Sequence, residues 1–106
     1  GNTFVGAWAG RENITANGNV AIGDSAMRLN LTGAQNTIIG YRAGERLTTT
    51  ANTMLGWRAG ASATTGNFNT FIGVQAGAAT TTGSSNYFLG TNAGQRNTTG
   101  SGNYFF

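Results

Sequence analysis

Residues Asn69–Gly77 read N-T-F-I-G-V-Q-A-G, and variants of this stretch recur along the whole chain of 106 residues. Each copy begins with an asparagine, and these are Asn2, Asn19, Asn36, Asn52, Asn69, Asn86 and Asn103. They are seventeen positions apart at every step except from Asn36 to Asn52, where the step is sixteen. In the first six copies, glycine follows four positions after the asparagine and alanine three positions after that glycine. A fixed period of this kind indicates a repeat architecture.

The length of the unit and its glycines indicate which repeat this is. A 17-residue unit is too short for a helical hairpin, and the 18 glycines of the chain would interrupt helices. The unit suits one coil of a parallel β-solenoid, or β-roll. It would hold a strand around residues 3–6, a Gly-Ala-Gly corner, a weaker threonine-rich strand and a Thr-Gly corner. The lack of proline fits, because the backbone of each coil must donate hydrogen bonds to its neighbour.

We therefore expect an all-β fold, a parallel β-solenoid of about six 17-residue coils that forms a single repeat domain over residues 1–106. Coils stacked about 4.8 Å apart make a rod of roughly 30 Å. Stacking also turns each repeat position into a column of side chains. The asparagine amides should bond to those above and below at one corner. The alanines should lie where the coil is narrow, and they are Ala9, Ala26, Ala43, Ala59, Ala76 and Ala93.

Both faces of the predicted strand are apolar, because neighbouring strand residues point in opposite directions. One column holds Phe4, Ala21, Ile38, Met54, Phe71, Phe88 and Phe105, and the next holds Val5, Ile22, Ile39, Leu55, Ile72 and Leu89. The aliphatic column suits the narrow interior beside the alanines, although the pattern leaves open which column faces inward. The other column would form an exposed apolar stripe, which normally marks an interface. We expect copies of the chain to cover it about the rod axis, with closed rotational symmetry.

Three segments carry a resemblance to known fibre proteins. Asn19–Ala26, N-V-A-I-G-D-S-A, resembles the head repeats of trimeric autotransporter adhesins, in which three chains form a left-handed parallel β-roll about one axis. Asn36–Gly44, N-T-I-I-G-Y-R-A-G, and Asn69–Gly77 are similar to repeats of bacteriophage tail fibres and bacterial surface fibres. The resemblance covers essentially the whole chain. It implies a homotrimer, a segment of a longer fibre, and an extracellular, cell-surface or virion location.

The composition argues against several classes of function. Without histidine or cysteine, the usual zinc, haem and iron–sulfur ligands and most catalytic constellations are missing. The three acids, Glu12, Asp24 and Glu45, occupy different repeat positions and form no paired carboxylates. We expect no enzyme, no metal and no cofactor. Six arginines without lysine are too sparse to follow nucleic acid, and no apolar run is long enough to insert in a membrane.

The candidate binding residues lie at the two free positions of the Gly-x-x-Ala corner. Tyr41 and Trp57 share the first free position, while Arg42 and Arg58 share the second, as does Trp8. Exposed aromatic rings beside arginines favour recognition of a cell-surface glycan or protein. The alternative is structural: the rings shield the seam between chains, or the arginines stack on them as cation–π pairs. Glu45 is expected to offset the charges of Arg42 and Arg58 at the surface.

These observations favour a structural and adhesive segment that projects or forms a receptor-binding surface. A pure structural spacer without a ligand is the alternative. The third possibility is an ice-binding ladder, because threonines stack at Thr48–Thr50, Thr64–Thr65, Thr80–Thr82 and Thr98–Thr99.

Overall fold

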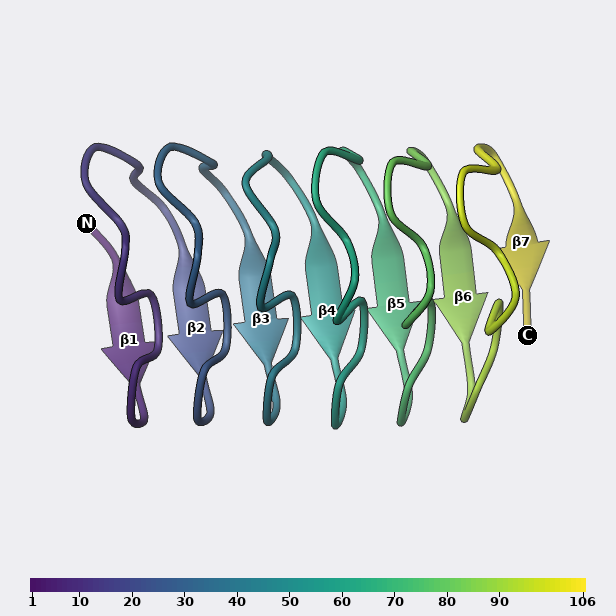
Figure 1. Cartoon of the computed structure of the whole chain (residues 1–106), viewed down its shortest axis with the longest axis horizontal. Coiled ribbons are helices and arrows are strands. Elements are labelled where there is room, and N and C mark those ends of the chain that lie inside the picture. The colour runs from purple at the N-terminus through teal and green to yellow at the C-terminus, as the bar shows by residue number, and fades with distance from the viewer.

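The computed structural model describes residues 1–106 and confirms an all-β parallel solenoid of about six coils (Figure 1). Its strands are β1 (Thr3–Val5), β2 (Val20–Ile22), β3 (Thr37–Ile39), β4 (Thr53–Leu55), β5 (Thr70–Ile72), β6 (Tyr87–Leu89) and β7 (Tyr104–Phe105). They form one parallel sheet in chain order. The chain therefore runs from one end of the rod to the other, with a coil between each strand and the next.

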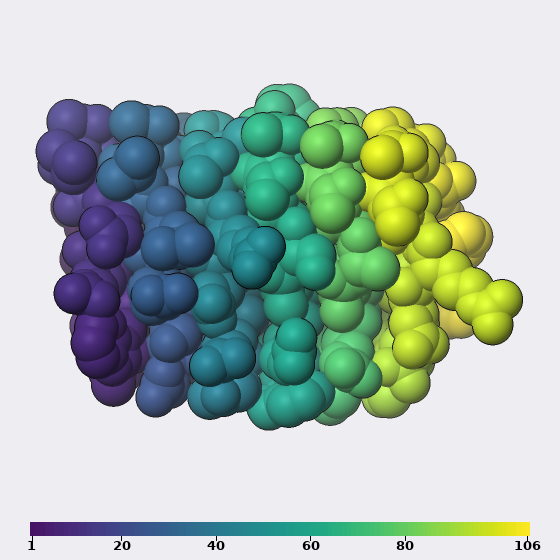
Figure 2. Space-filling view, viewed as in Figure 1, coloured from purple at the N-terminus to yellow at the C-terminus, as the bar shows by residue number.

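The repeat period sets the register of the sheet. Each strand residue pairs with the residue at the same repeat position in the next coil, as Phe71 pairs with Phe88. The shorter spacing before Asn52 leaves this register intact, because Ile38 still pairs with Met54. The molecule measures 31 × 20 × 16 Å, and its long dimension agrees with the predicted rod. Figure 2 shows the coils following one another as bands along this rod.

The glycine that follows each strand is required by both backbone conformation and packing. Gly73 has a φ of +135°, which side-chain-bearing residues rarely adopt. A Cβ at Gly73 would lie 2.5 Å from the carbonyl carbon of Gly90 in the next coil. The chain can therefore turn the corner and keep the coils in contact only if this position lacks a side chain.

Each coil contains one strand and not two, so the predicted threonine-rich strand is wrong. In the third coil, residues 47–52 are bends and irregular chain. Ala51 in this segment has a positive φ of 61°, and the corresponding residue of the next coil, Phe68, has 59°. Because the left-handed residue curves the segment, too few consecutive residues are extended to form a continuous ladder. The threonine hydroxyls contribute instead, as Thr64 Oγ1 donates to the carbonyl of Thr81 at 3.1 Å.

The core is a single column of large side chains inside the coils. Ile38, Met54, Phe71 and Phe88 are fully buried, and the rings of Phe71 and Phe88 stack with centroids 5.0 Å apart. The alanine column packs against them as predicted, with Ala26, Ala43, Ala59 and Ala76 fully buried. The suggestion that the aliphatic column suits the interior is wrong. The alanine and glycine corners leave enough room for phenyl rings, so the aliphatic side chains point outward.

The asparagine column joins neighbouring coils by hydrogen bonds, but the amide-to-amide bonds that the sequence predicts form at only some of the steps. Asn69 Oδ1 accepts a hydrogen bond from the backbone N–H of Asn86 at 3.0 Å. Its Nδ2 donates to the carbonyl of Gly83 at 2.9 Å, within the same coil. Direct amide-to-amide bonds occur at some steps, such as Asn36 Nδ2 to Asn19 Oδ1 at 3.2 Å. The more regular bond is therefore the one from the next backbone N–H, and it fixes the spacing of the coils.

Candidate functional site

The corner after each strand determines where the candidate residues lie. The second free residue of the Gly-x-x-Ala corner has a positive φ in every complete coil, and Trp8, Arg42 and Arg58 have values of 65°, 52° and 55°. The repeated geometry aligns equivalent corner side chains along the rod. All five candidate residues are at least partly exposed. Their identities are therefore not dictated by burial in the core.

Tyr41 and Trp57 form a shared aromatic surface, as their common repeat position predicts. Their rings are stacked with centroids 6.2 Å apart and an angle of 13° between planes. Each is less than half exposed, at 41% and 45%. The guanidinium of Arg42 lies 5.3 Å from the Tyr41 ring centroid, and that of Arg58 lies 5.4 Å from the Trp57 ring centroid. The cation–π contacts of the alternative interpretation are thus present in the same surface.

Trp8 lies two coils from Tyr41 and lines a hollow in the surface of the rod. It is 53% exposed, and the guanidinium of Arg11 lies 4.2 Å from its ring centroid. The hollow has a volume of about 350 Å³. Tyr41 of the third coil also lines it. The other lining residues are Asp24, Ser25 and Arg28 of the second coil and Arg42 and Glu45 of the third. Trp8 is therefore connected to the Tyr41 surface through this hollow.

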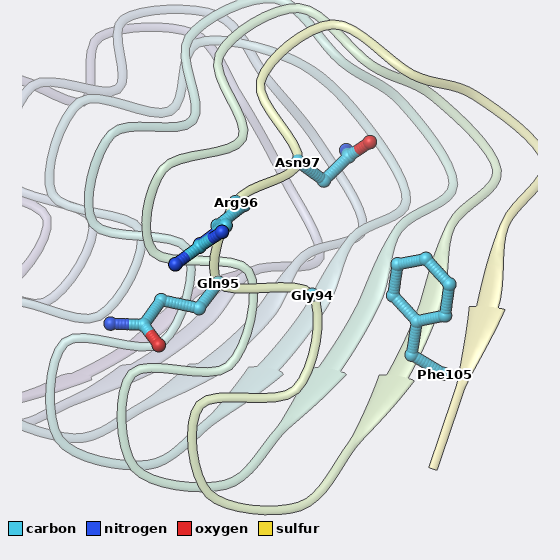
Figure 3. Close-up of a pocket in the computed structure, with 5 residues that line it drawn as sticks. All are labelled: Gly94, Gln95, Arg96, Asn97 and Phe105. Atoms are coloured by element: carbon cyan, nitrogen blue, oxygen red, sulfur yellow. The ribbon is translucent and has the colours of Figure 1, made fainter.

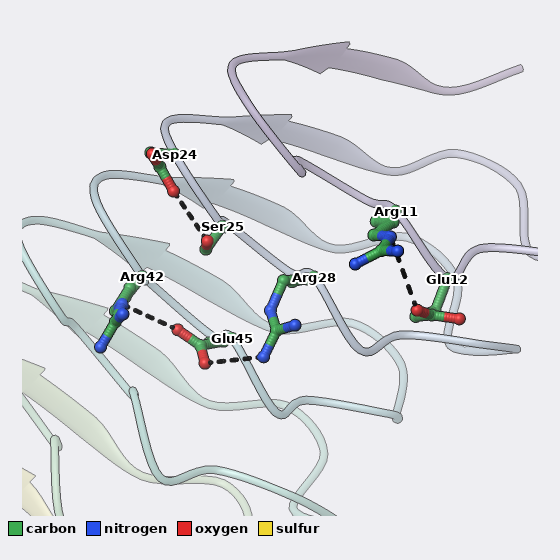
Figure 4. A network of polar contacts seen from close by, with 7 residues as sticks. All are labelled: Arg11, Glu12, Asp24, Ser25, Arg28, Arg42 and Glu45. Atoms are coloured by element: carbon green, nitrogen blue, oxygen red, sulfur yellow. Dashed lines mark hydrogen bonds and ion pairs between the residues drawn. The ribbon is translucent and has the colours of Figure 1, made fainter.

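Ion pairs connect neighbouring turns in this region (Figure 4). Glu45 lies 3.4 Å from Arg42 within its own coil and 3.4 Å from Arg28 in the preceding coil. The expectation that Glu45 offsets both Arg42 and Arg58 is therefore only half right, because Arg28 takes the place expected for Arg58. The Arg28 contact follows from the repeat, since both residues occupy the position directly after the corner. Partly exposed pairs of this kind contribute about 1 kcal/mol or less.

A second, smaller hollow contains three arginines. Its volume is about 220 Å³, and its lining residues are Arg42, Glu45, Arg46, Arg58, Ala61 and Ser62. The Nε of Arg58 is buried and has no hydrogen-bond partner. Arg46 is not among the residues that the sequence pattern indicates. The repeat assigns it a position two residues beyond the corner glycine, but does not show that this position faces Arg58 of the next coil.

A third hollow, of about 470 Å³, opens at the C-terminal end of the rod (Figure 3). The Phe105 ring lies inside the coil, stacked on Phe88 at 5.0 Å, while Gln95 and Arg96 point away from it. The hollow is lined by Gly94, Gln95, Arg96 and Asn97 beside this ring, and it contains none of the five candidate residues.

No protein-family model, curated protein or solved structure matches this chain. No helix of the chain is long and apolar enough to cross a bilayer. The acidic side chains form no group of three or more that could bind a metal ion.

Proposed function

We propose that this chain is a structural and adhesive segment of an extracellular or virion fibre. Three copies associate about an axis parallel to the rod, and the corners carry a surface that recognises a cell-surface glycan or protein. One observation carries the proposal: an apolar column on the outer face of the sheet extends along the rod. Its most exposed members are Val5, Leu55 and Ile22, at 55%, 44% and 36%.

The outer column supports association with copies of the same chain. Fully burying an aliphatic side chain is worth about 1.5–3 kcal/mol. With roughly a third of each of the six side chains still exposed, covering the column contributes about 3–6 kcal/mol per chain. Copies related by rotation about an axis parallel to the rod keep equivalent coils at the same height, so each aliphatic residue lies level with its own equivalents. The choice of three chains follows from the resemblance to trimeric adhesin heads.

The corner surface supports recognition. Stacked rings of Tyr41 and Trp57 with flanking guanidiniums provide apolar area and fixed hydrogen-bond donors together. A threefold assembly would present three such surfaces, so that weak individual sites gain by avidity. The pure spacer would have the same rod and the same assembly without a ligand.

The geometry gives no support to ice binding. The hydroxyls of Thr48, Thr64 and Thr81 each donate to a backbone carbonyl of the following coil, at 3.0, 3.1 and 3.2 Å. These protons are already used within the rod, and the segment is bent.

Light scattering tests the assembly. We expect a mass three times the 10.9 kDa of one chain. Leu55→Arg combined with Ile72→Arg should give a folded monomer, because both side chains belong to the outer column. Ile14→Arg is the control, since Ile14 is 76% exposed outside the sheet. A wild-type protein that scatters as a single chain of 10.9 kDa at micromolar concentration would contradict the proposal.

Binding of the wild-type protein to a glycan array and to intact cells separates adhesion from the spacer. The Trp57→Ala, Arg58→Ala double variant should lose binding at an unchanged melting temperature. Undiminished binding would remove this surface from the proposal. A collapse of the melting temperature would instead show that the ring and its arginine stabilise the assembly.

A further inference from the structure

We propose that Arg42, Arg46 and Arg58 bind the sulfate or carboxylate group of an acidic saccharide, with the Trp57 ring as the adjoining surface for the sugar. This inference specifies the ligand class of the recognition surface proposed above and rests on that proposal. Arg46 is an addition to the residues that the sequence indicates.

The smaller hollow is rich in positive charge. Three arginines line one hollow of about 220 Å³, and its only acidic lining residue is Glu45. Glu45 is already shared, at 3.4 Å each, between Arg42 and Arg28. Arg46 and Arg58 form no salt bridge, in contrast to the other arginines nearby. The hollow therefore has an excess of positive charge that a bound oxyanion would balance.

Arg58 has a hydrogen-bond donor that is not satisfied within the chain. The Nε of Arg58 is buried and has no hydrogen-bond partner. Buried polar groups without a partner are rare because they lose their hydration without compensation. The Arg58 guanidinium also lies 5.4 Å from the Trp57 ring centroid, which limits its orientations. Because the Nε atom is buried, a small rotation of the Arg58 side chain would be needed to bring this donor to an acceptor oxygen in the hollow, and the bond formed there would end its unsatisfied state.

The shape of the cluster selects the kind of anion. Guanidiniums bind carboxylates and sulfates through paired N–H donors. The cluster comes from two adjacent coils. Of the three arginines outside it, Arg28 in the second coil pairs with Glu45, and Arg11 and Arg96 belong to the first and sixth coils. A polynucleotide would require positive charge continued along the rod. A compact site beside an exposed tryptophan instead fits one anionic group attached to a ring with an apolar face.

The test compares matched probes on the intact, assembled protein. Lactose, 3′-sulfolactose and 3′-sialyllactose differ in the anionic group, and NMR titration measures their Kd values. We expect both acidic probes to bind at least tenfold more tightly than lactose, and their binding to weaken as sodium chloride is raised. Arg46→Gln and Arg58→Gln should each weaken acidic-probe binding by about tenfold or more.

Arg96→Gln is the matched control, because Arg96 occupies the repeat position of Arg46, forms no salt bridge and lies outside the hollow. It should leave binding unchanged. Arg58→Lys retains the charge but removes the paired donors, so it should also weaken binding. This variant keeps the test valid if Arg58→Gln fails to fold.

The outcomes distinguish this inference from the proposed function. Equal affinity for lactose and the acidic probes, or an Arg46→Gln variant that binds like the wild type, would overturn the inference while leaving the recognition surface in place. Loss of binding in Arg96→Gln as in Arg46→Gln would also overturn it. If a single-stranded oligonucleotide binds as tightly as 3′-sulfolactose, the hollow recognises negative charge without regard to the sugar. That result would overturn the assignment of an acidic saccharide as the ligand. Failure to bind any array glycan or any cell would refute the proposed recognition itself.

Discussion

The second coil departs from the repeat at two positions, and we predict that the two departures compensate each other. Ala21 stands where the other complete coils have a phenylalanine, isoleucine or methionine inside the strand. Met27 stands where the others have glycine. Both side chains are fully buried and belong to the same core cluster. We expect single substitutions at either position to destabilise the rod and the double substitution Ala21→Phe, Met27→Gly to restore it.

The glycines of the other coils supply the steric reason. A Cβ at Gly77 would lie 2.7 Å from the Phe71 ring, and one at Gly10 would lie 2.6 Å from the Phe4 ring. A side chain at this position therefore competes for space with a large strand residue. In the second coil the strand residue is Ala21, and the thioether of Met27 fills the space from the opposite wall.

The structure sets the magnitudes. Removing a buried methionine side chain costs about 2–5 kcal/mol. Glycine relieves the left-handed conformation of Met27, whose φ is 54°, by about 1–2 kcal/mol. Met27→Gly should therefore lower the free energy of unfolding by about 2 kcal/mol, which is the cost of the lost side chain less the backbone relief. Ala21→Phe should lower it by about 1–3 kcal/mol or more by overpacking against Met27.

A double-mutant cycle measures the compensation. All four proteins are unfolded in urea at one fixed chain concentration, because association changes apparent stability. We expect a coupling free energy of at least about 2 kcal/mol in favour of the double variant, which removes the cost of both single changes. If the two single effects simply add, Ala21 and Met27 do not share space and the steric reasoning is refuted.

Three further changes test other columns of the rod. Ala59→Leu should destabilise the fold by about 1–3 kcal/mol through overpacking, whereas Ala78→Leu at a half-buried turn position should cost less. Equal melting temperatures of the two variants would contradict a buried alanine column. Asn69→Ala should cost about 2 kcal/mol or more in urea unfolding, because the Asn86 N–H and the Gly83 carbonyl lose their partner; a change within experimental error would exclude a stabilising role for the asparagine column. Gly77→Ala should lower the melting temperature more than Gly18→Ala. Both glycines have a positive φ, but only a Cβ at Gly77 would meet an aromatic ring. Equal shifts in melting temperature would mean that φ strain alone accounts for the effect.

The solenoid could be predicted because its period is a constraint on every coil at once. Asn69, Gly73 and Ala76 recur together, and only stacked coils give each of them the same neighbours above and below. The orientation of the strand could not be predicted. Alternation places Phe71 and Ile72 on opposite faces, but both faces are apolar, so the pattern does not select one. The room left by glycines such as Gly77 decides it, and that room is a property of the folded corner.

In the candidate site, contacts between residues at the same repeat position could be predicted, but contacts between different repeat positions could not. Tyr41 and Trp57 share a repeat position, and stacking alone brings their rings together. Of the two partners of Glu45, Arg28 shares its repeat position and so follows from stacking, whereas Arg42 lies at a different repeat position and reaches Glu45 only through the fold of the turn. Arg46 was missed for the same reason. Residues at different repeat positions meet only through the shape of this turn.

Core columns and corner columns are under different constraints. This explains why the second coil, with Asp24 and Ser25 at its corner, stacks in the same way as the fourth, with Trp57 and Arg58. A residue inside the coil must fit its neighbours above and below, so Phe71 is constrained by Phe88 and by Gly77. A corner residue such as Trp57 contacts the solvent on one side and can change without altering the register of the strands. Aromatic side chains can therefore concentrate on two adjacent coils, as they do at Tyr41 and Trp57, while the rest of the rod sets their spacing. If three chains share one axis, each change at a corner is repeated three times at the same height, and a small gain in affinity per site is multiplied through avidity.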